Sequence, residues 1–303
     1  MENTWYIIAN PTSGNGLVQR KWKSVIASLD QHNLIYQFAF SEFEHHEEEL
    51  VYKALEKGFK KFICVGGDGT LHHIVNGIMT QNFIDSSLIK VAVIPMGTGN
   101  DWVKTYKIPK IIKKSITIIK NENIIIQDIG ELITLNTGEK IYFNNVAGLG
   151  FDAFVVKNVI KYKKFGAFAY LLGALTTFIQ YKKCILKIEL NDRIIYSKVL
   201  MTLVGICNYC GGGMQLTKKG SSTDGLFDIS IAKNFNFFSI LKNIRKFYNG
   251  RIIEHKEVEI YSTATIKIET NDDATYIQAD GELVGTGGFK ATIIPKAISF
   301  VVP

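Results

Sequence analysis

The sequence has little proline and no apolar segment long enough to cross a bilayer. Five prolines in 303 residues, and no low-complexity tract or internal repeat, leave little room for long linkers. One apolar segment stands out, residues 165–179, but its 15 residues fall short of the roughly 20 that a membrane-spanning helix needs. We therefore expect no transmembrane helix.

Secretion signals and disulfide patterns are also absent. The first residues, MENTWYIIANPTSG, lack the charged segment and apolar stretch of a signal peptide. Four cysteines in a chain of this size are typical of reduced thiols in a cytosol. Cys207 and Cys210 have CxxC spacing without a second pair, which favours two small structural residues over a metal or redox site.

Several nucleotide-binding signatures are missing as well. No GxxxxGK[ST] motif occurs, which excludes a P-loop protein, and no GxGxxG follows the first apolar run, so dinucleotide redox chemistry lacks support. Neither HRD nor DFG is present, which excludes the protein-kinase fold.

The overall composition indicates a folded protein with an excess of positive charge. The chain is 47% hydrophobic and 21% charged, and 303 residues suffice for two domains. A net charge of +7 favours phosphate-bearing ligands, anionic membranes or nucleic acid without choosing among them.

The first third alternates strand and helix patterns, which predicts a parallel sheet with helices on its faces. Helices are expected around Val18–Leu29, in the acidic segment ending at Lys57-Gly58, and over residues 71–79. The expected strands are Trp5–Ala9, Leu34–Phe40, Phe62–Val65 and Val91–Ile94.

After about residue 128 the pattern changes to short strands between turn residues. We expect an antiparallel sandwich interrupted by two helices, with a hinge near Gln127–Gly130. The expected strands are Ile141–Ala147, Ile185–Leu190, Ile194–Cys207, Leu226–Ala232, Thr263–Thr270, Thr275–Ala279 and Ala291–Ile294.

A lysine-flanked apolar segment, residues 157–183, interrupts this second half. One interpretation is a core helix of the second domain. The other is a helix beside a lipid-facing cleft, whose lysines reach toward anionic headgroups. These lysines are Lys157, Lys161, Lys163, Lys164, Lys182 and Lys183.

Three glycine-bearing loops follow expected strands of the parallel sheet: NPTSGNG (10–16), GGDGT (66–70) and PMGTGND (95–101). Ligands bind at the carboxyl ends of such strands, where glycines let backbone N–H groups approach a phosphate. Three loops at one sheet edge favour a polyphosphate site over ordinary tight turns.

Carboxylates within these loops suggest a metal ion. An acid beside a phosphate site repels its ligand unless a cation lies between them, and Mg²⁺ prefers carboxylate, water and phosphate oxygens. Asp68, Asp101 and Asp128 could surround one such ion; the alternative is that Asp68 and Asp101 only cap their helices.

An ordered set of motifs along nearly the whole chain resembles the diacylglycerol-kinase catalytic family, which includes bacterial lipid kinases and the catalytic regions of sphingosine and ceramide kinases. Each motif is degenerate, but the ordered set is specific. The motifs are NPTSG, VGGDGTLHHIVNGI, IPMGTGNDW, QDIG, NVAGLGFDA, GGGM, DGLFDI and ADGE.

The resemblance implies two lobes with ATP in the cleft between them. An N-terminal α/β lobe like those of NAD kinases and phosphofructokinases would cover residues 1–128. A C-terminal antiparallel β-sandwich lobe for the lipid substrate would cover residues 129–303, with the last few residues returning to the first lobe.

The resemblance also assigns roles to residues. Asp68, Asp101 and Asp128 match the acids that organise Mg²⁺ and the phosphates, and Glu282 matches the general base. The matching nucleotide contacts are Asn10, Ser13, Gly14, Ser41, Gly66, Gly67, Gly69, Thr70 and Thr98, with Ser41 in place of the family's usual threonine.

A second Mg²⁺ in the family binds at a DG-x-L turn, here through Asp224, the Leu226 carbonyl and Ser221. The segment before this turn departs from the family pattern, because Lys218-Lys219-Gly220 stands where Pro-x-Ala is common. The integrity of this second site is therefore open.

The resemblance implies an ATP- and Mg²⁺-dependent lipid kinase, with diacylglycerol as the expected acceptor and phosphatidic acid as the product. We expect a cytoplasmic enzyme bound peripherally to the inner face of the membrane, without a nucleic-acid partner. An NAD-kinase-type phosphotransferase and a non-catalytic lipid-binding protein are the alternatives. The oligomeric state stays open, a homodimer included.

Overall fold

The chain folds into two compact units. The computed structural model describes residues 3–159, 173, 176–218 and 220–303. One unit comprises Met1–Gln127 and Lys296–Pro303, and the other comprises Asp128–Pro295. Strand β5 (Ile124–Thr134) carries the chain from the first unit into the second, and β18 (Phe289–Val301) carries it back.

The first unit is built on a parallel sheet. Its strand order is β2-β1-β3-β4, and the end of β18 pairs with β4 in parallel at Ser299–Lys90 and Phe300–Val91. Strand β18 therefore completes the sheet from the far end of the sequence. The strands are β1 (Trp5–Ala9), β2 (Tyr36–Phe40), β3 (Lys61–Gly66) and β4 (Lys90–Pro95).

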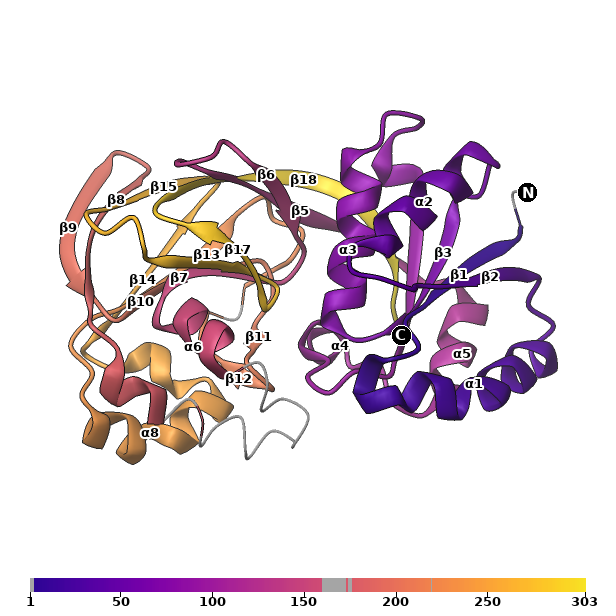
Figure 1. Ribbon diagram of the computed structural model, residues 1–303, viewed down its shortest axis with the longest axis horizontal. Coiled ribbons are helices and arrows are strands. Elements are labelled where there is room, and N and C mark those ends of the chain that lie inside the picture. Colours follow the sequence, from indigo (N-terminus) through magenta and orange to yellow (C-terminus); the bar gives the residue numbers. More distant parts are fainter. Residues whose placement is uncertain (1–2, 160–172, 174–175, 219) are drawn as a thin grey trace. The chain divides into compact units, whose positions relative to one another are not determined.

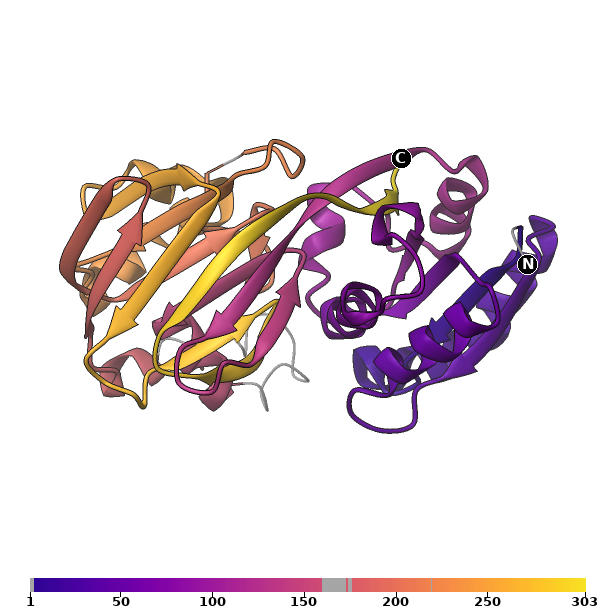
Figure 2. The same cartoon turned by 90° about the horizontal axis from the view of Figure 1, so that it is seen from above.

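Helices cover both faces of this sheet (Figures 1 and 2). On one face, Val18, Val25 and Leu29 of α1 and Ile116 of α5 pack with buried strand residues in one core cluster. Helices α2 and α3 cover the other face. The helices are α1 (Ser13–Gln31), α2 (His46–Glu56), α3 (Asp68–Thr80), α4 (Asp101–Thr105), α5 (Ile112–Asn121) and the 3-10 helix η1 (Ser86–Leu88).

The second unit is an antiparallel β-sandwich. One layer has the order β14-β13-β10-β7-β16-β17, and the other contains β18-β15-β8-β9, with β5 pairing with β18 and β6. The strands are β6 (Lys140–Phe143), β7 (Val146–Gly150), β8 (Cys184–Leu190), β9 (Arg193–Val199), β10 (Met201–Gly205), β13 (Phe227–Ala232), β14 (Val258–Thr263), β15 (Thr265–Thr270), β16 (Tyr276–Ala279) and β17 (Glu282–Thr286).

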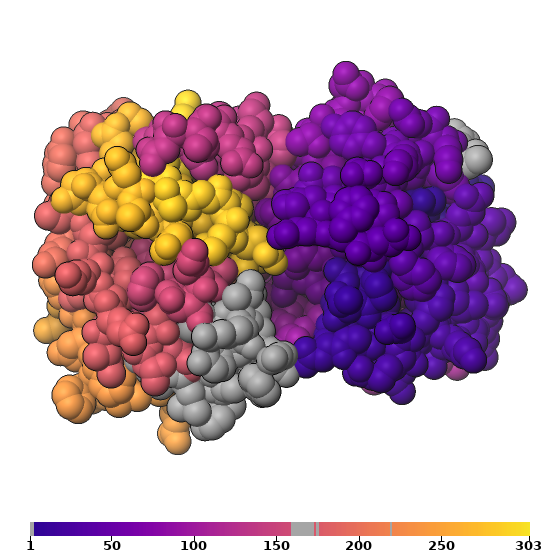
Figure 3. All heavy atoms as spheres, viewed as in Figure 1, coloured from indigo at the N-terminus to yellow at the C-terminus, as the bar shows by residue number. Residues whose placement is uncertain are grey.

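Smaller elements complete this unit. A two-stranded ribbon, β11 (Tyr209–Cys210) and β12 (Met214–Gln215), lies beside α8 (Phe237–Asn249). Helix α6 (Phe151–Val159) packs on β7, β16 and β17, and η3 (Arg251–Glu254) follows α8. Figure 3 shows the C-terminal strands in yellow beside the magenta β5 and β6 on one face of the unit.

The predicted parallel α/β lobe and the predicted β-sandwich are both confirmed. The structure corrects two of the expected strands. The run Ile194–Cys207 is two strands in different layers, because β9 pairs with β8 while β10 pairs with β7 and β13. The run Ile141–Ala147 divides in the same way, because β6 pairs with β5 while β7 pairs with β10 and β16. The run Thr263–Thr270 corresponds to β15 apart from its first two residues. The alternation of side chains does not reveal where a chain changes layers.

No helix within the described ranges combines the length and apolarity needed to cross a bilayer. Most of the lysine-flanked segment 157–183, including Lys161, Lys163 and Lys164, lies outside the described residues. The choice between a core helix and a lipid-facing helix therefore stays a prediction.

Candidate active site

Three loops meet at the carboxyl edge of the parallel sheet in the first unit. The first follows β1 at Asn10, the second follows β3 at Gly67, and the third follows β4 at Met96. Backbone hydrogen bonds tie them together, since Asn10 N–H donates to Val65 O at 3.1 Å and Met96 N–H donates to Gly66 O at 2.7 Å. The adjacency expected from the parallel sheet is thus present.

Glycines allow these loops to approach each other without side chains between them. A Cβ atom on Gly97 would lie 2.3 Å from the Gly67 Cα, and one on Gly14 would lie 2.2 Å from the Met96 carbonyl oxygen. Gly14 also has a φ of +60°, a left-handed conformation that glycine adopts without steric cost. A side chain at any of these positions would force the loops apart.

Asp68 caps a helix, but not its own. It is the first residue of α3, and its Oδ1 accepts hydrogen bonds from the N–H groups of Asp101 at 2.8 Å and Trp102 at 3.2 Å, at the start of α4. Asn100 shapes the same turn, since its Oδ1 accepts from Gly97 N–H and its Nδ2 donates to Gly97 O. The carboxylate of Asp68 therefore fixes the third loop against the second.

Asp68 and Asp101 border one small space beside Gly99. A Cβ atom built on Gly99 would lie 3.0 Å from Oδ2 of Asp68 and 3.7 Å from Oδ2 of Asp101. Asp101 is buried and forms an ion pair of 2.7 Å with Lys104. Two carboxylates and one ammonium group thus gather where three glycine loops converge.

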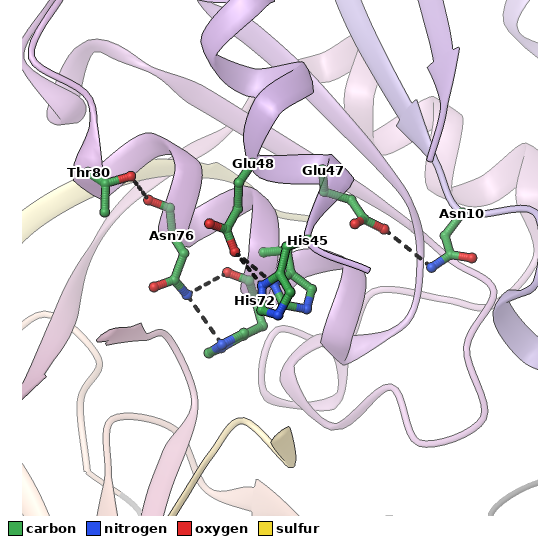
Figure 4. Close-up of polar contacts among 8 residues, drawn as sticks. Asn10, His45, Glu47, Glu48, His72, Asn76 and Thr80 are labelled. Atoms are coloured by element: carbon green, nitrogen blue, oxygen red, sulfur yellow. Dashed lines mark hydrogen bonds and ion pairs between the residues drawn. The ribbon is translucent and has the colours of Figure 1, made fainter. Parts of the chain in front are cut away.

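Asn10 and Ser41 lie at the ends of neighbouring strands. The Asn10 Oδ1 accepts from Thr12 N–H and Oγ1–H, and its Nδ2 donates to Oε1 of Glu47 at 3.3 Å (Figure 4). The N–H of Ser41 donates to Ala9 O at 3.0 Å. Sequence reasoning missed Glu47, a buried acid of α2 that holds the first loop, because it reads as an ordinary surface acid of a helix start.

The remaining predicted nucleotide contacts belong to the same three loops. Ser13 is close to the second loop, since a Cβ atom on Gly67 would lie 3.5 Å from its Oγ. Thr70 is buried under Gly66, whereas Thr98 is exposed at the tip of the third loop. Gly69 lies in the first turn of α3.

A second cluster of predicted residues lies in the second unit. Asp128 is fully buried, and its Oδ2 accepts from Gly225 N–H at 2.7 Å while its own N–H donates to Ser222 O. The exposed Asp224 closes its turn by accepting from Leu226 N–H at 3.1 Å. Asp128 thereby contacts the turn in which the second metal site was expected. In the same turn, the hydroxyl groups of the exposed Ser221 and of Thr223 form a hydrogen bond.

Glu282 begins β17 after a tight turn. The preceding Asp280 accepts three backbone hydrogen bonds, from the N–H groups of Asn144, Asn145 and Val146 at 2.9–3.1 Å. The next residue, Gly281, donates to Oε1 of Gln278, whose Nε2 donates to Asp152 at 2.9 Å. The turn that presents the half-buried Glu282 is therefore fixed on both sides.

Asp152 is a titratable group in the second unit that the sequence motifs did not single out for a role. The residue is half-buried, but its Oδ1 is shielded from solvent. Burial raises the pKa of the Asp152 carboxyl to about 6, although the hydrogen bond from Gln278 opposes the shift. A carboxylic acid with this pKa titrates near neutral pH.

Two family descriptions match the chain. The diacylglycerol kinase catalytic domain matches residues 4–132, and the YegS C-terminal NAD kinase beta sandwich-like domain matches residues 145–302. Together they cover both units, and the chain belongs to the diacylglycerol kinase-type lipid kinase family.

Named relatives and a solved structure resemble the chain over nearly its whole length. A diacylglycerol kinase of Staphylococcus haemolyticus is 27% identical over 92% of this chain and 82% of its own, and one of Bacillus subtilis is 25% identical over 92% and 89%. A diacylglycerol kinase structure from Bacillus anthracis shares the fold, with a TM-score of 0.74 at 18% identity over 99% of this chain and 97% of that chain. The chain is therefore a phosphotransferase that acts on a lipid alcohol, with lipid and nucleotide substrates.

Proposed function

We propose that the protein transfers the γ-phosphate of ATP to the hydroxyl group of diacylglycerol, giving phosphatidic acid, in a reaction that depends on Mg²⁺. The observation that supports this proposal best is the placement of Asp68 and Asp101 where the three glycine loops converge. The Oδ1 atom of Asp68 caps α4 and the Oδ1 atom of Asp101 pairs with Lys104, but the Oδ2 atoms of both residues border the space beside Gly99, which capping alone does not require.

The loops would bind the triphosphate through their backbone. The first turn of α3 directs N–H groups toward the sheet edge, and the field of a helix N-terminus favours an anion. Asn10, Ser13 and Gly14 would contact the nucleotide from the first loop. The contacts from the other two loops and the end of β2 would be Ser41, Gly66, Gly67, Gly69, Thr70 and Thr98.

The acids fit a magnesium ion, because carboxylates are the ligands that Mg²⁺ takes from proteins beside phosphates and water. Asp68 and Asp101 would hold it, and Asp128 is the third acid that the family resemblance assigns to the ion. When bound, the ion neutralises the charge that develops on the transferred phosphoryl group. Asp224, Ser221 and the Leu226 carbonyl would hold a second, structural ion.

Glu282 would act as the general base. Phosphoryl transfer passes through a loose transition state, so the acceptor alcohol gives up its proton only as the new bond forms. A rigid turn presents Glu282, which suits a base that must meet the acceptor in one orientation. We further propose that the enzyme acts at the inner face of the cytoplasmic membrane, because its acceptor is a membrane lipid.

A lipid screen with labelled ATP tests the proposal. Diacylglycerol, ceramide, sphingosine, phosphatidylglycerol and NAD are offered to the wild type with and without Mg²⁺, and we expect label in phosphatidic acid only with Mg²⁺. If another lipid becomes labelled, the protein is still a lipid kinase, but diacylglycerol is not its acceptor. Label in NAD would favour the NAD-kinase alternative.

Two variants test the assigned residues. Glu282→Gln should lower turnover by about 10²–10⁴-fold with little change in nucleotide affinity. Asp68→Asn keeps an oxygen that can accept from Asp101 N–H, so it should fold normally while losing at least about 100-fold in turnover and shifting the Mg²⁺ dependence. Normal turnover in either variant would remove that residue from the scheme.

Matched controls separate chemistry from folding. Asp85→Asn changes another aspartate that caps a helix start, since Asp85 accepts from Ser87 N–H at η1. Glu139→Gln changes an exposed acid of the second unit. Both should keep wild-type turnover. Asp68→Ala removes the cap as well as the charge and should cost about 1 kcal/mol of stability.

A further inference from the structure

We propose that His45, Glu48 and His73 form a binding site for one divalent transition-metal ion of the zinc class. His45 immediately precedes α2, Glu48 lies in the first turn of α2, and His73 lies in α3. None of the three belongs to the residues assigned above to phosphoryl transfer.

The three side chains converge on one point. Nδ1 of His45 lies 3.1 Å from Oε1 of Glu48 (Figure 4). Nδ1 of His73 lies 2.9 Å from the same oxygen. The two imidazole rings meet edge to face, with centroids 4.5 Å apart. Each residue offers one potential metal-ligating atom, and these three atoms lie within 4.8 Å of one another. Among the described residues, this is the one group of at least three such side chains.

The donor set and its spacing suit zinc. Two histidine nitrogens and one glutamate oxygen are a ligand set of catalytic zinc sites, in which water takes the fourth position. Bonds of about 2.0–2.2 Å in a tetrahedral arrangement separate neighbouring ligand atoms by about 3.3 Å. The two distances to the Glu48 oxygen, 2.9 and 3.1 Å, are a few tenths of an ångström shorter than this spacing, and the ligand atoms of the two histidines lie within 4.8 Å of each other. Imidazole ligands also distinguish this site from an oxygen-lined Mg²⁺ site.

The residue next to His45, His46, is held by the preceding loop. Nδ1 of His46 accepts a hydrogen bond from Glu42 N–H at 3.1 Å, and the His46 ring stacks on Phe43 at 4.3 Å. Nδ1 of His46 is thus engaged elsewhere, and His46 does not belong to the group of converging ligand atoms. His45 itself adopts a φ of +64°, a left-handed conformation at the start of the helix.

Charge and access favour a cation here. The surrounding segment is rich in acids, namely Glu42, Glu44, Glu47, Glu48 and Glu49. The side chain of His45 is 63% exposed, which gives an ion a path from solvent, whereas His73 is 15% exposed and is held by α3. A bound ion would link the start of α2 to α3.

The same geometry has a metal-free explanation that the experiment must exclude. Each imidazole can donate an Nδ1 hydrogen to the Glu48 carboxylate, and two hydrogen bonds of this kind bring the three groups together without an ion. Zinc would replace those two hydrogens. The decisive property is therefore saturable metal binding that depends on all three residues.

Calorimetric titration of chelator-treated full-length protein with Zn²⁺, without nucleotide, tests the site. We expect a single saturable site in the wild type and a higher melting temperature with Zn²⁺ than with chelator. Co²⁺ should give the visible absorption of a tetrahedral site. His45→Asn should weaken Zn²⁺ binding more than about tenfold. Asparagine is well tolerated at positive φ, so this variant keeps the fold.

Further variants complete the test. Glu48→Gln and His73→Gln should each lose a similar factor in affinity. His32→Asn removes a half-buried histidine at the C-cap of α1 and should leave the titration unchanged. Cys210→Ser removes a thiol of the CxxC pair, the alternative place for zinc, and should also leave it unchanged.

Two outcomes would overturn the site. One is no saturable binding of Zn²⁺ or Co²⁺ at micromolar concentration. The other is binding that survives in His45→Asn and His73→Gln, or that disappears in Cys210→Ser, which would place the ion elsewhere. Because none of these readouts uses kinase activity, failure of the metal site and failure of the proposed kinase reaction are distinguishable.

Discussion

Individual acids in this protein serve the fold and the proposed chemistry together. Asp68 caps α4 with one oxygen while the other lies beside Gly99, and Asp128 binds the Gly225 N–H from a fully buried position. A charged group that accepts backbone hydrogen bonds is held in one orientation. The same bonds that stabilise these loops therefore also fix the orientation of the carboxylates that we propose to bind a metal ion.

Asp152 leads to a prediction at the residue scale. Its folded pKa of about 6 exceeds the ordinary value of about 3.9, so the folded state binds the proton more tightly than the unfolded state. The contribution of this group to the free energy of unfolding is fully present below about pH 4 and is lost as the pH rises through about 6. We expect Asp152→Asn to gain up to about 2–3 kcal/mol relative to wild type between pH 4 and pH 8.

Urea unfolding at several pH values measures this difference. Asp192→Asn, at an exposed turn position, is the matched control for the loss of one negative surface charge. An Asp152→Asn difference that does not change with pH would show that the carboxyl titrates normally.

At the scale of secondary structure, turns determine where the proposed catalytic groups point. The turn between β16 and β17 places Asp280 under the start of β7, where the carboxylate accepts three N–H groups. Asp280 has a φ of +53°, so these bonds also hold a backbone conformation that is uncommon outside glycine. The turn is therefore a structural support for Glu282.

Removing that carboxylate should destabilise the second unit. Asp280→Ala leaves three buried N–H groups without their acceptor, and we expect a loss of about 3 kcal/mol in the free energy of unfolding. Turnover should fall with it, because Glu282 loses its fixed position. Asp272→Ala is the matched control: Asp272 is an exposed turn residue that accepts one hydrogen bond, from Ala274 N–H, and its loss should cost less than about 1 kcal/mol. Equal stabilities for the two variants would contradict the role of Asp280.

For the whole molecule, net charge and substrate class bear on where the enzyme acts. The chain carries a net charge of +7, and anionic lipid surfaces attract basic proteins over a distance set by salt. A kinase whose acceptor lies in a membrane must reach that surface. Charge attraction provides a way to do so.

Vesicle sedimentation tests this attraction. We expect the protein to bind phosphatidylglycerol vesicles at low salt and to release them steeply as salt rises, since the screening length falls from about 10 Å at 0.1 M to about 3 Å at 1 M. Neutral phosphatidylcholine vesicles are the control. Replacing Lys182 and Lys183 with glutamine should weaken binding. If binding does not change with salt concentration, charge attraction does not drive it.

The sequence by itself determined the two lobes and the loops of the site. Strand–helix alternation and glycine spacing are local signals, so the parallel sheet, the three loops and the ordered motifs could be predicted. Strands β6 and β7, and strands β9 and β10, were not separated, because a short apolar run looks the same whichever layer it joins. Strands β5, β14 and β17 were not predicted.

Only the tertiary structure decided which distant groups meet. The cap from Asp68 to α4, the bond from Glu47 to Asn10 and the cluster of His45, Glu48 and His73 each join residues from separate elements. The points at which the chain crosses from one sheet of the sandwich to the other, Leu200 and Ala264, were likewise decided by the tertiary structure. Spacing along a chain specifies neighbours within a helix or strand, whereas contacts between elements depend on how those elements pack.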